Sequence, residues 1–219
     1  DLSGLADGPL TVTASVSDAA GNPATATDTA ALDTTAAITV SLEDVNSGNV
    51  GAAPITGTTA GVEAGQTVTL VITDGTATVT VTAVVNPDGS YSTTADLSGL
   101  ADGPLTVTAS VSDTAGNPAT ATDTAALDTT AAITVSLEDV NGGNVGAAPI
   151  TGTTNGVEAG QTVTLQITDG TATVTVTAIV NPDGSYTTTA DLSTLADGPL
   201  TVTATVSDTA GNPATATDT

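Results

Sequence analysis

Apolar and polar side chains alternate along short segments throughout this chain, and turn-forming residues separate the segments. In 66–73, for example, Val68, Leu70 and Ile72 share one parity, and threonines fill most of the other. A period of two residues indicates a β-strand with one buried face. Between 34 and 128 this pattern predicts seven strands and no helix, at about 36–42, 54–58, 66–73, 76–85, around Tyr91, 105–111 and 119–127.

Turn signals join these predicted strands. Asp74-Gly75 lies between two alternating segments, which is the pattern of a type I′ hairpin. Asn86-Pro87-Asp88-Gly89 predicts a second turn, and 112–118 predicts a loop between the last two strands. Tyr91, as the one aromatic residue of the segment, is expected in the core. Seven short strands without a helix predict an all-β fold, an immunoglobulin-like β-sandwich.

The whole pattern repeats with a period of 95 residues. The segment 1–33 differs from 96–128 only at Ala19/Thr114, and 34–124 differs from 129–219 at seven positions: Ser47/Gly142, Ala60/Asn155, Val71/Gln166, Val84/Ile179, Ser92/Thr187, Gly99/Thr194 and Ser110/Thr205. Such a period is too long for a solenoid and fits one small all-β domain. We therefore expect the last two strands of a truncated repeat in 1–33, a complete repeat in 34–128 and a nearly complete one in 129–219.

The differences between copies also predict which face of a strand is buried. Val71 becomes Gln166, so that position tolerates a polar side chain and is expected to face solvent. Because side chains alternate across a sheet, Val68 and Ile72 should then face the core. The frequent Thr-x-Thr pairs are interpreted as solvated strand surface rather than as a flat ice-binding face, which would need a shorter period.

Composition removes most catalytic chemistry. The 219 residues include 24 Asp and Glu but no Lys, Arg, His, Cys, Met, Trp or Phe. The chain therefore has no imidazole base, no thiolate and no Schiff-base amine. It has no cation to bind phosphate, so nucleic acid is excluded as a partner. No apolar run is long enough to span a membrane. We expect neither an enzyme nor a small-molecule substrate.

The acids are expected to gather where successive repeats meet. If the strands run up and down, one end of each sandwich carries five acids of a period and the other end carries three: Glu43, Asp44, Asp74, Asp96 and Asp102, against Glu63, Asp88 and Asp113. Facing carboxylates without a cation repel one another. Calcium, which accepts six to eight oxygen ligands from several loops, would relieve that repulsion. The alternative is that the acids are dispersed and hydrated and only keep the protein soluble.

The loop Val111-Ser112-Asp113-Thr114-Ala115-Gly116-Asn117 and the linker Asp128-Thr129-Thr130-Ala131 resemble the end and linker of bacterial immunoglobulin-like repeats. Near-identical copies of such repeats form the extender regions of giant RTX adhesins of Gram-negative bacteria. The resemblance implies a spacer with Ca²⁺ at the linkers, on a type I-secreted protein at the outer membrane. The metal-ligand candidates, first from the resemblance and then from the acid pattern, are Asp33, Asp128, Asp113, Asp208, Asp102, Asp7, Asp18, Glu63, Glu158, Asp44 and Asp139.

Three other functions remain as alternatives at this point. A carbohydrate- or protein-binding adhesin module would need an aromatic platform or distinctive loops, whereas Tyr91 and Tyr186 recur at equivalent positions. A glycosidase could use acids alone, but it would need a cleft. Disorder is suggested by the high net charge and opposed by the regular alternation. The favoured hypothesis is a monomeric linear array of repeats whose partners are the neighbouring repeats, outside the cell and without membrane insertion.

Overall fold

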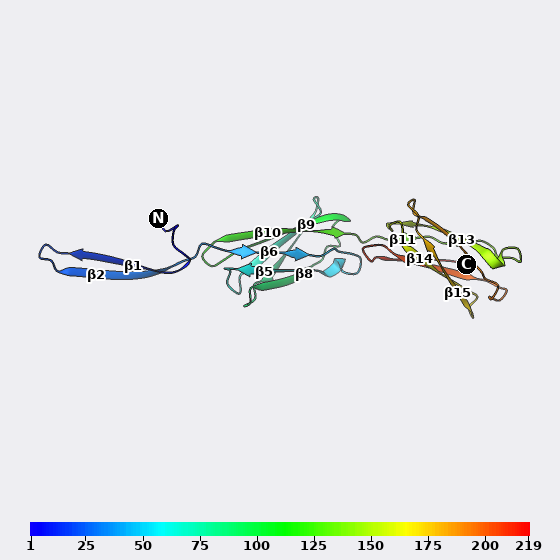
Figure 1. The fold of residues 1–219 in the computed structure, drawn as a ribbon, viewed down its shortest axis with the longest axis horizontal. Coiled ribbons are helices and arrows are strands. Elements are labelled where there is room, and N and C mark those ends of the chain that lie inside the picture. The colour runs from blue at the N-terminus through cyan, green and yellow to red at the C-terminus, as the bar shows by residue number, and fades with distance from the viewer. The chain divides into compact units, whose positions relative to one another are not determined.

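The computed structural model describes residues 1–219, and the chain forms two compact units. The first unit comprises 1–42, 54–95 and 106–124; the second comprises 43–53, 96–105 and 125–219. The boundary therefore crosses the second of the three sequence repeats, which are called here the first (1–33), second (34–128) and third (129–219) repeat. Apart from two 3-10 turns, η1 (Val50–Ala52) and η2 (Val145–Ala147), every element is a β-strand (Figure 1).

The strands of the second repeat form two four-stranded sheets. One sheet has the order β10-β9-β6-β7, and the other joins β3, β5 and β4, with β8 paired to β5. The pairs β3–β5, β4–β5, β6–β7 and β6–β9 are antiparallel. Two antiparallel sheets with one apolar face each make a β-sandwich. The bounds are β3 (Ala37–Ile38), β4 (Ser41–Leu42), β5 (Ala53–Ala60), β6 (Thr67–Thr73), β7 (Thr78–Val84), β8 (Ser90–Ala95), β9 (Gly103–Ser112) and β10 (Pro118–Leu127).

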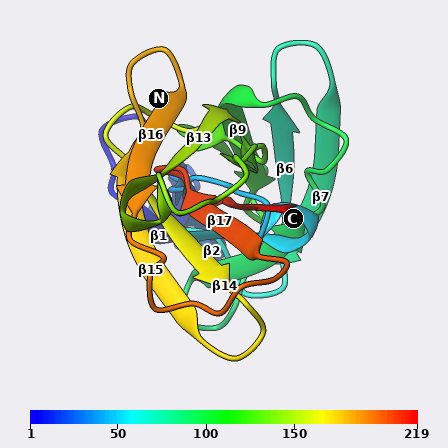
Figure 2. The same ribbon diagram turned by 90° about the vertical axis from the view of Figure 1, so that its right-hand side faces the viewer.

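The third repeat has the same two sheets, with the orders β15-β14-β17-β18 and β11-β13-β12 plus β16 on β13. Figure 2 shows β14, β15 and β17 of the first of these sheets together with β13 and β16 of the other. The expected all-β sandwich fold is thus present in both repeats. The bounds are β11 (Ala132–Ile133), β12 (Ser136–Leu137), β13 (Ala148–Asn155), β14 (Thr162–Thr168), β15 (Thr173–Ile179), β16 (Ser185–Ala190), β17 (Thr201–Ser207) and β18 (Pro213–Asp218).

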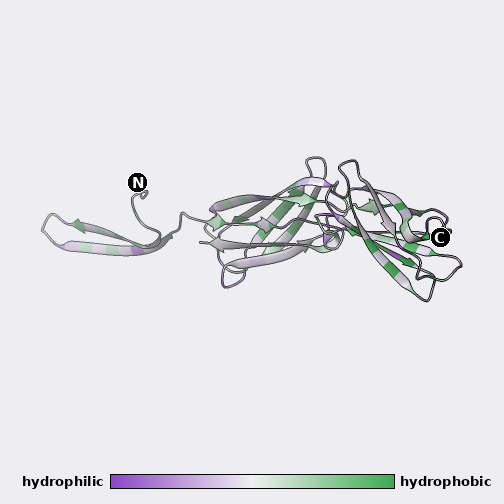
Figure 3. Cartoon of the chain, turned by 45° about the vertical axis from the view of Figure 1, so that its right-hand side comes forward, coloured by the Kyte–Doolittle hydropathy of each residue, from purple (hydrophilic) through white to green (hydrophobic).

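The period-two pattern places the core as the sequence predicts. Val68, Leu70 and Ile72 of β6 are each 0% exposed, whereas Val71 is half-buried and its counterpart Gln166 is exposed. The alternation is visible as bands of apolar and polar colour along the strands in Figure 3. In the third repeat the core also contains valine, leucine, isoleucine and alanine around a single tyrosine.

The predicted strand over 36–42 is wrong in one respect, because it is broken into β3 and β4. The hydroxyl of Tyr91, a residue that is 1% exposed, donates to the main-chain oxygen of Thr39 at the break. That oxygen is therefore bonded to a side chain instead of to the sheet. Gly57 makes room for the contact, because a Cβ there would collide with the Thr39 oxygen and the Tyr91 ring. Tyr186, Thr134 and Gly152 repeat the arrangement in the third repeat.

The predicted type I′ turn at Asp74-Gly75 is also wrong. A type I′ turn requires positive φ at both central residues, but only Gly75 has it, at +90°. Asp74 instead accepts from the main-chain N–H groups of Thr76 and Ala77 through one carboxylate oxygen, each at 2.7 Å. The loop is thus longer than a two-residue turn. The aspartate side chain accepts the hydrogen bonds that the backbone of such a turn would otherwise make.

The first repeat contains a single hairpin of β1 (Gly8–Ser17) and β2 (Pro23–Leu32), which form a two-stranded antiparallel sheet. Its register runs without interruption from Gly8 opposite Leu32 to Ser17 opposite Pro23. Most of its side chains are exposed, including those of Val12 and Val16. The hairpin therefore forms its backbone bonds without a buried apolar face.

Candidate functional site

Each linker between repeats is held by one aspartate of the preceding segment. The two carboxylate oxygens of Asp102 accept from the hydroxyls of Thr129 and Thr130, at 2.8 and 3.1 Å. Asp7 accepts from Thr34 and Thr35 in the same way, at 2.7 and 2.9 Å. These hydroxyls favour the ionised carboxylates, and the pKa values of Asp7 and Asp102 are below their usual range. At Asp102 the hydrogen bonds outweigh an opposing desolvation.

A second anchor comes from the loop between the last two strands of each repeat, which runs from Asp113 to Asn117 in the second repeat. Oδ1 of Asp113 accepts from the main-chain N–H of Asn117 at 2.8 Å, and Oδ2 accepts from its side-chain amide at 2.7 Å. Gly116, at φ +94°, supplies the left-handed residue that closes the loop. Desolvation of Asp113 opposes ionisation, but these donors outweigh it and lower its pKa.

The same asparagine side chain reaches the linker. Nδ2 of Asn117 lies 3.1 Å from the main-chain oxygen of Asp33 and 3.4 Å from its Oδ1. Nδ2 of Asn212 lies 2.8 and 3.5 Å from the same atoms of Asp128, and 2.7 Å from Oδ2 of Asp208. At both linkers, one main-chain oxygen and two carboxylates therefore converge on one donor nitrogen.

This convergence is the observation against which a calcium ion can be tested. Calcium binds carboxylate and main-chain oxygens together, and the amide nitrogen stands where such a cation would meet three oxygens. Only two acids converge there, and no group of three or more acids assembled to hold a metal occurs in the structure. The donor set Asp33 with Asp113, and Asp128 with Asp208, therefore fits calcium chemistry but forms only part of a coordination shell.

Glu63 and Glu158 lie next to this centre rather than in it. The carboxylate of Glu63 accepts from the main-chain N–H of Thr114 at 2.9 Å and from its hydroxyl. The Thr114 hydroxyl is the main cause of the lowered pKa of Glu63, and the nearby negative charge of Asp113 opposes it. Glu158 and Thr209 repeat the contact at 2.9 and 2.6 Å.

The remaining candidates are placed elsewhere. Asp44 accepts from the main-chain N–H of Ala126 at 2.7 Å, and Asp18 binds Asn22 within its own hairpin. Asp139 lines a cavity of about 590 Å³ at the other end of the third repeat. The structure thus brings together the linker aspartates and the loop aspartates of the second and third repeats, and it does not add Asp44 or Asp139 to them. Asp18 binds Asn22 as Asp113 binds Asn117.

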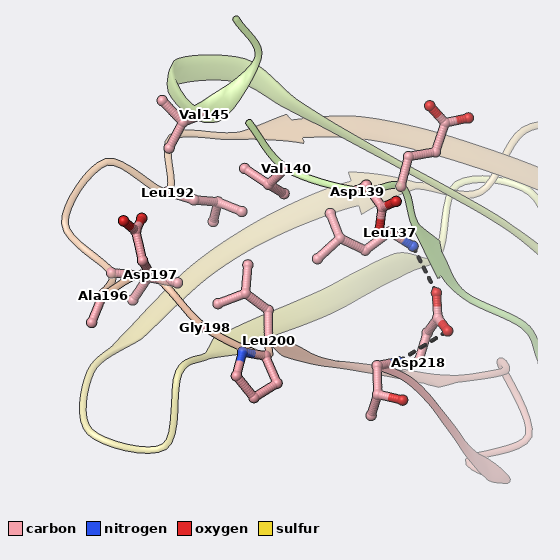
Figure 4. Close-up of a pocket in the computed structure, with 14 residues that line it drawn as sticks. Leu137, Asp139, Val140, Val145, Leu192, Ala196, Asp197, Gly198, Leu200 and Asp218 are labelled. Carbon is pink, nitrogen blue, oxygen red and sulfur yellow. Dashed lines mark hydrogen bonds between the residues drawn. The ribbon is translucent and has the colours of Figure 1, made fainter. Parts of the chain in front are cut away.

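The cavity beside Asp139 lies among Leu137, Val140, Leu200 and Asp218 (Figure 4). In the second repeat the equivalent valine, Val45, forms a bridge with Leu127, and both are 2% exposed. No aromatic side chain lines the cavity, so it offers no stacking platform for a ligand.

Asn117 and Asn212 are the site residues that counting acids missed. Each follows a glycine in the repeated Asp-Thr-Ala-Gly-Asn sequence. An Asp four residues before an Asn, across a glycine turn, was a usable signal, since the Asp side chain commonly binds backbone groups ahead of it.

Fold and site together define a tandem array of immunoglobulin-like β-sandwich repeats whose linkers are held by aspartate and asparagine side chains. No protein-family model and no curated protein matches the chain. Solved structures do match it. The chain is similar to a tetra-tandem repeat from the extending region of a large adhesion protein, with 38% identity, a TM-score of 0.45 and coverage of 100% of this chain and 58% of that one.

Two other structures are 27% identical to the chain. One concerns the host cell surface retention of a 1.5-MDa bacterial ice-binding adhesin, with coverage of 100% and 75% and a TM-score of 0.47. The other is a Ca²⁺-stabilized adhesin of an Antarctic bacterium that binds ice, with coverage of 96% and 56% and a TM-score of 0.49. All three belong to adhesion proteins. The expected resemblance to repeats of large bacterial adhesins is confirmed.

Proposed function

We propose that this chain is part of a structural extender, a spacer that carries a distal ligand-binding domain of a large bacterial adhesin away from the cell. The observation that supports this most directly is that both linkers have the same fastening. Asp7 binds Thr34 and Thr35 as Asp102 binds Thr129 and Thr130. A segment in which both the domains and the joints between them repeat is suited to act as a spacer. A spacer needs no ligand-binding site.

The proposed domain boundaries follow from these joints. Each repeat begins after the linker aspartate, so 34–128 is one domain, 129–219 is a second, and 1–33 contributes the last two strands of another. The proposed assembly is a monomeric linear array in which each repeat has the neighbouring repeats as partners. The similarity to adhesin repeats supports an extracellular location at the bacterial surface, and type I secretion is part of the same proposal. No helix of the structure is long and apolar enough to cross a membrane.

We further propose that calcium binds at each linker. The ligands would be the main-chain oxygen and carboxylate of Asp33 with the carboxylate of Asp113, and the same atoms of Asp128 with Asp208. The convergence of these oxygens on the asparagine amide supports the proposal, as does the similarity to a Ca²⁺-stabilized adhesin. Bound calcium would neutralise the linker acids and stabilise the folded repeat by binding only to it.

The test is a calcium titration of the whole chain, followed by melting temperature and by small-angle X-ray scattering. Extracellular calcium modules bind at roughly 10⁻⁴–10⁻³ M, so millimolar calcium should raise the melting temperature, and EDTA should reverse the change. Asp128→Ala should remove the part of the response that comes from the third repeat. The matched control is Asp88→Ala, because that carboxylate binds only Ser90 nearby in the chain.

Two outcomes would contradict the calcium proposal, and a third would contradict the spacer function. A melting temperature and a scattering profile that are the same in calcium and in EDTA would leave the acids as a solubilising surface. An equal loss of response in Asp128→Ala and Asp88→Ala would place the ion elsewhere. Binding of glycans or a protein ligand by the isolated repeats would favour an adhesin module over a spacer.

A further inference from the structure

Two loops from successive repeats meet through a pair of short hydrogen bonds. The side-chain amide of Asn46 donates to the main-chain oxygen of Ala210 at 2.7 Å, and the main-chain N–H of Ser47 donates to Oδ1 of Asn212 at 2.7 Å. All four residues lie within the second compact unit. Both donors come from the loop 46–49 of the second repeat, the donor loop, and both acceptors come from the loop 208–212 of the third, the acceptor loop.

The donor loop has the same internal bonds whether or not a partner is present. The main-chain N–H of Asn46 donates to Oδ1 of Asn49, and Gly48 donates to Oδ1 of Asn46, both at 2.8 Å. In the third repeat, Asn141 and Gly143 make the same two bonds at 2.7 and 2.8 Å, and no repeat docks on that loop in the structure. The donor loop is therefore preformed, and docking orders few additional groups.

The acceptor loop is preformed as well. Asn212 donates to the two carboxylate oxygens of Asp208 through its main chain and its amide, at 2.8 and 2.7 Å. Asn117 makes the same bonds to Asp113, although no donor loop precedes that repeat in the structure. In both copies the asparagine Nδ2 is used within the repeat and by the linker, which leaves Oδ1 as the acceptor; in Asn212 it accepts from Ser47.

Burial distinguishes the engaged copy of each loop from the free copy. Asn46 is half-buried and its counterpart Asn141 is exposed; Asn212 is 1% exposed and its counterpart Asn117 is only half-buried. The sequences of the paired loops are nearly the same, so the difference arises from the contact itself. Both bonds are part-buried, and a hydrogen bond that is partly shielded from water is stronger than an exposed one.

We propose that the donor loop and the acceptor loop form a recognition pair. Through this pair the C-terminal end of one repeat, which carries the donor loop, docks only on the N-terminal end of another, which carries the acceptor loop. The pair is one-way, because one loop supplies only donors to the contact and the other only acceptors. It involves no ion and no charged group. In the absence of calcium these bonds can therefore fix the joint without the linker acids, which distinguishes the pair from the acid-based function proposed above.

The contact also tolerates a difference between the copies. Ser47 becomes Gly142 in the third repeat. Because position 47 contributes its main-chain N–H and not its side chain, this exchange leaves the donor intact. Asn46 contributes its side-chain amide, and it is Asn141 in the other copy. The chemistry of the contact thus requires asparagine at the first position and only a backbone N–H at the second.

The experiment is amide hydrogen exchange of the whole chain by NMR in excess EDTA, so that calcium plays no part. A net hydrogen bond of about 1 kcal/mol corresponds to about fivefold. After correction for intrinsic rates, the Ser47 amide should therefore exchange at least about fivefold more slowly than the Gly142 amide. Asn46→Ala should remove that protection, whereas Asn141→Ala, the matched control, should leave it unchanged. Ser47→Gly should keep the protection.

Equal exchange of the Ser47 and Gly142 amides in the native chain would overturn the proposal. So would a loss of protection at Gly142 in Asn141→Ala as large as the loss at Ser47 in Asn46→Ala, which would reduce Asn46 to a residue that shapes its own loop. Neither result would bear on the calcium titration, since Asn46 is no ligand of the proposed ion. Conversely, a chain that does not respond to calcium but still protects Ser47 would retain the recognition pair.

Discussion

The hairpin β1–β2 and the hairpin β9–β10 have the same sequence in every strand position, yet their surroundings differ completely. Val12 and Val16 are 65% and 67% exposed, whereas Val107 and Val111 are 0% and 5% exposed. Backbone pairing is nevertheless formed throughout β1–β2. The comparison separates two contributions that a strand sequence makes: alternation sets which side chains share a face, whereas burial of that face, and with it most of the stability, depends on a second sheet.

The largest expected effect comes from placing a charge at the same position in the two hairpins. Val107→Asp should destabilise the second repeat by more than about 4 kcal/mol, because the carboxylate would be buried without a partner. Val12→Asp should stay within about 0.5 kcal/mol, as an exposed substitution. Urea unfolding followed by Tyr91 fluorescence, in a Tyr186→Phe background, measures the first change, and amide hydrogen exchange of β1–β2 measures the second. A comparable loss in Val12→Asp would mean that the hairpin buries its apolar face in solution.

Alkaline pH should lower the stability of the second and third repeats but not that of the hairpin, and this effect is smaller. Burial raises the pKa of Tyr91 to about 12, and the hairpin has no tyrosine. A tyrosine ionises near pH 10 in an unfolded chain, so its contribution is complete below pH 10 and is lost as the pH rises toward 12. Melting temperature against pH, with phenolate absorbance as the probe, should show the loss. Tyr91→Phe should remove the second repeat's share of it.

The smallest expected effect concerns the one position at which 1–33 and 96–128 differ, Ala19/Thr114. Thr114→Ala should raise the pKa of Glu63, because the hydroxyl of Thr114 is the main cause of its lowering. A lowered carboxyl pKa stabilises the fold above the unfolded value, and this contribution is lost as the pH falls through the folded pKa. Thr114→Ala should therefore reduce acid sensitivity slightly.

A carboxyl NMR titration of Glu63, with the melting temperature at neutral pH, checks this prediction. Ala19→Thr is the matched control and should change neither quantity, since no glutamate of the structure lies opposite that position in the hairpin. An unchanged titration of Glu63 in Thr114→Ala would show that the main-chain N–H of Thr114 holds the carboxylate on its own.

The strands and their buried faces could be predicted because they depend on neighbouring residues. Val68, Leu70 and Ile72 are buried as the alternation and the Val71/Gln166 exchange indicated. The break between β3 and β4 could not be predicted, because Tyr91, whose hydroxyl donates to the Thr39 oxygen at the break, lies 52 residues away from Thr39. The pair Asp74-Gly75 is typical of a tight turn. Sequence alone does not show that the Asp74 side chain accepts from two backbone N–H groups, which makes the loop longer.

The site was predicted only in part for a related reason. Acids were considered as charges that need a cation, and the assignment of Asp33, Asp113, Asp128 and Asp208 as metal ligands stays a prediction. In the structure most carboxylates are also acceptors for nearby hydroxyls and amides, as Asp102 is for Thr129 and Thr130. Such donors are abundant in a chain this rich in threonine, and their partners depend on loop geometry that composition does not contain.

The repeated fastening of Asp7 to Thr34 and Thr35, and of Asp102 to Thr129 and Thr130, has a consequence for how such a chain can vary. A deletion or duplication of one period of 95 residues brings together the same aspartate and the same two threonines. Recombination between copies of the coding sequence would therefore change the copy number in whole steps and leave every joint chemically unchanged. Length becomes a heritable quantity that can be adjusted without altering any domain.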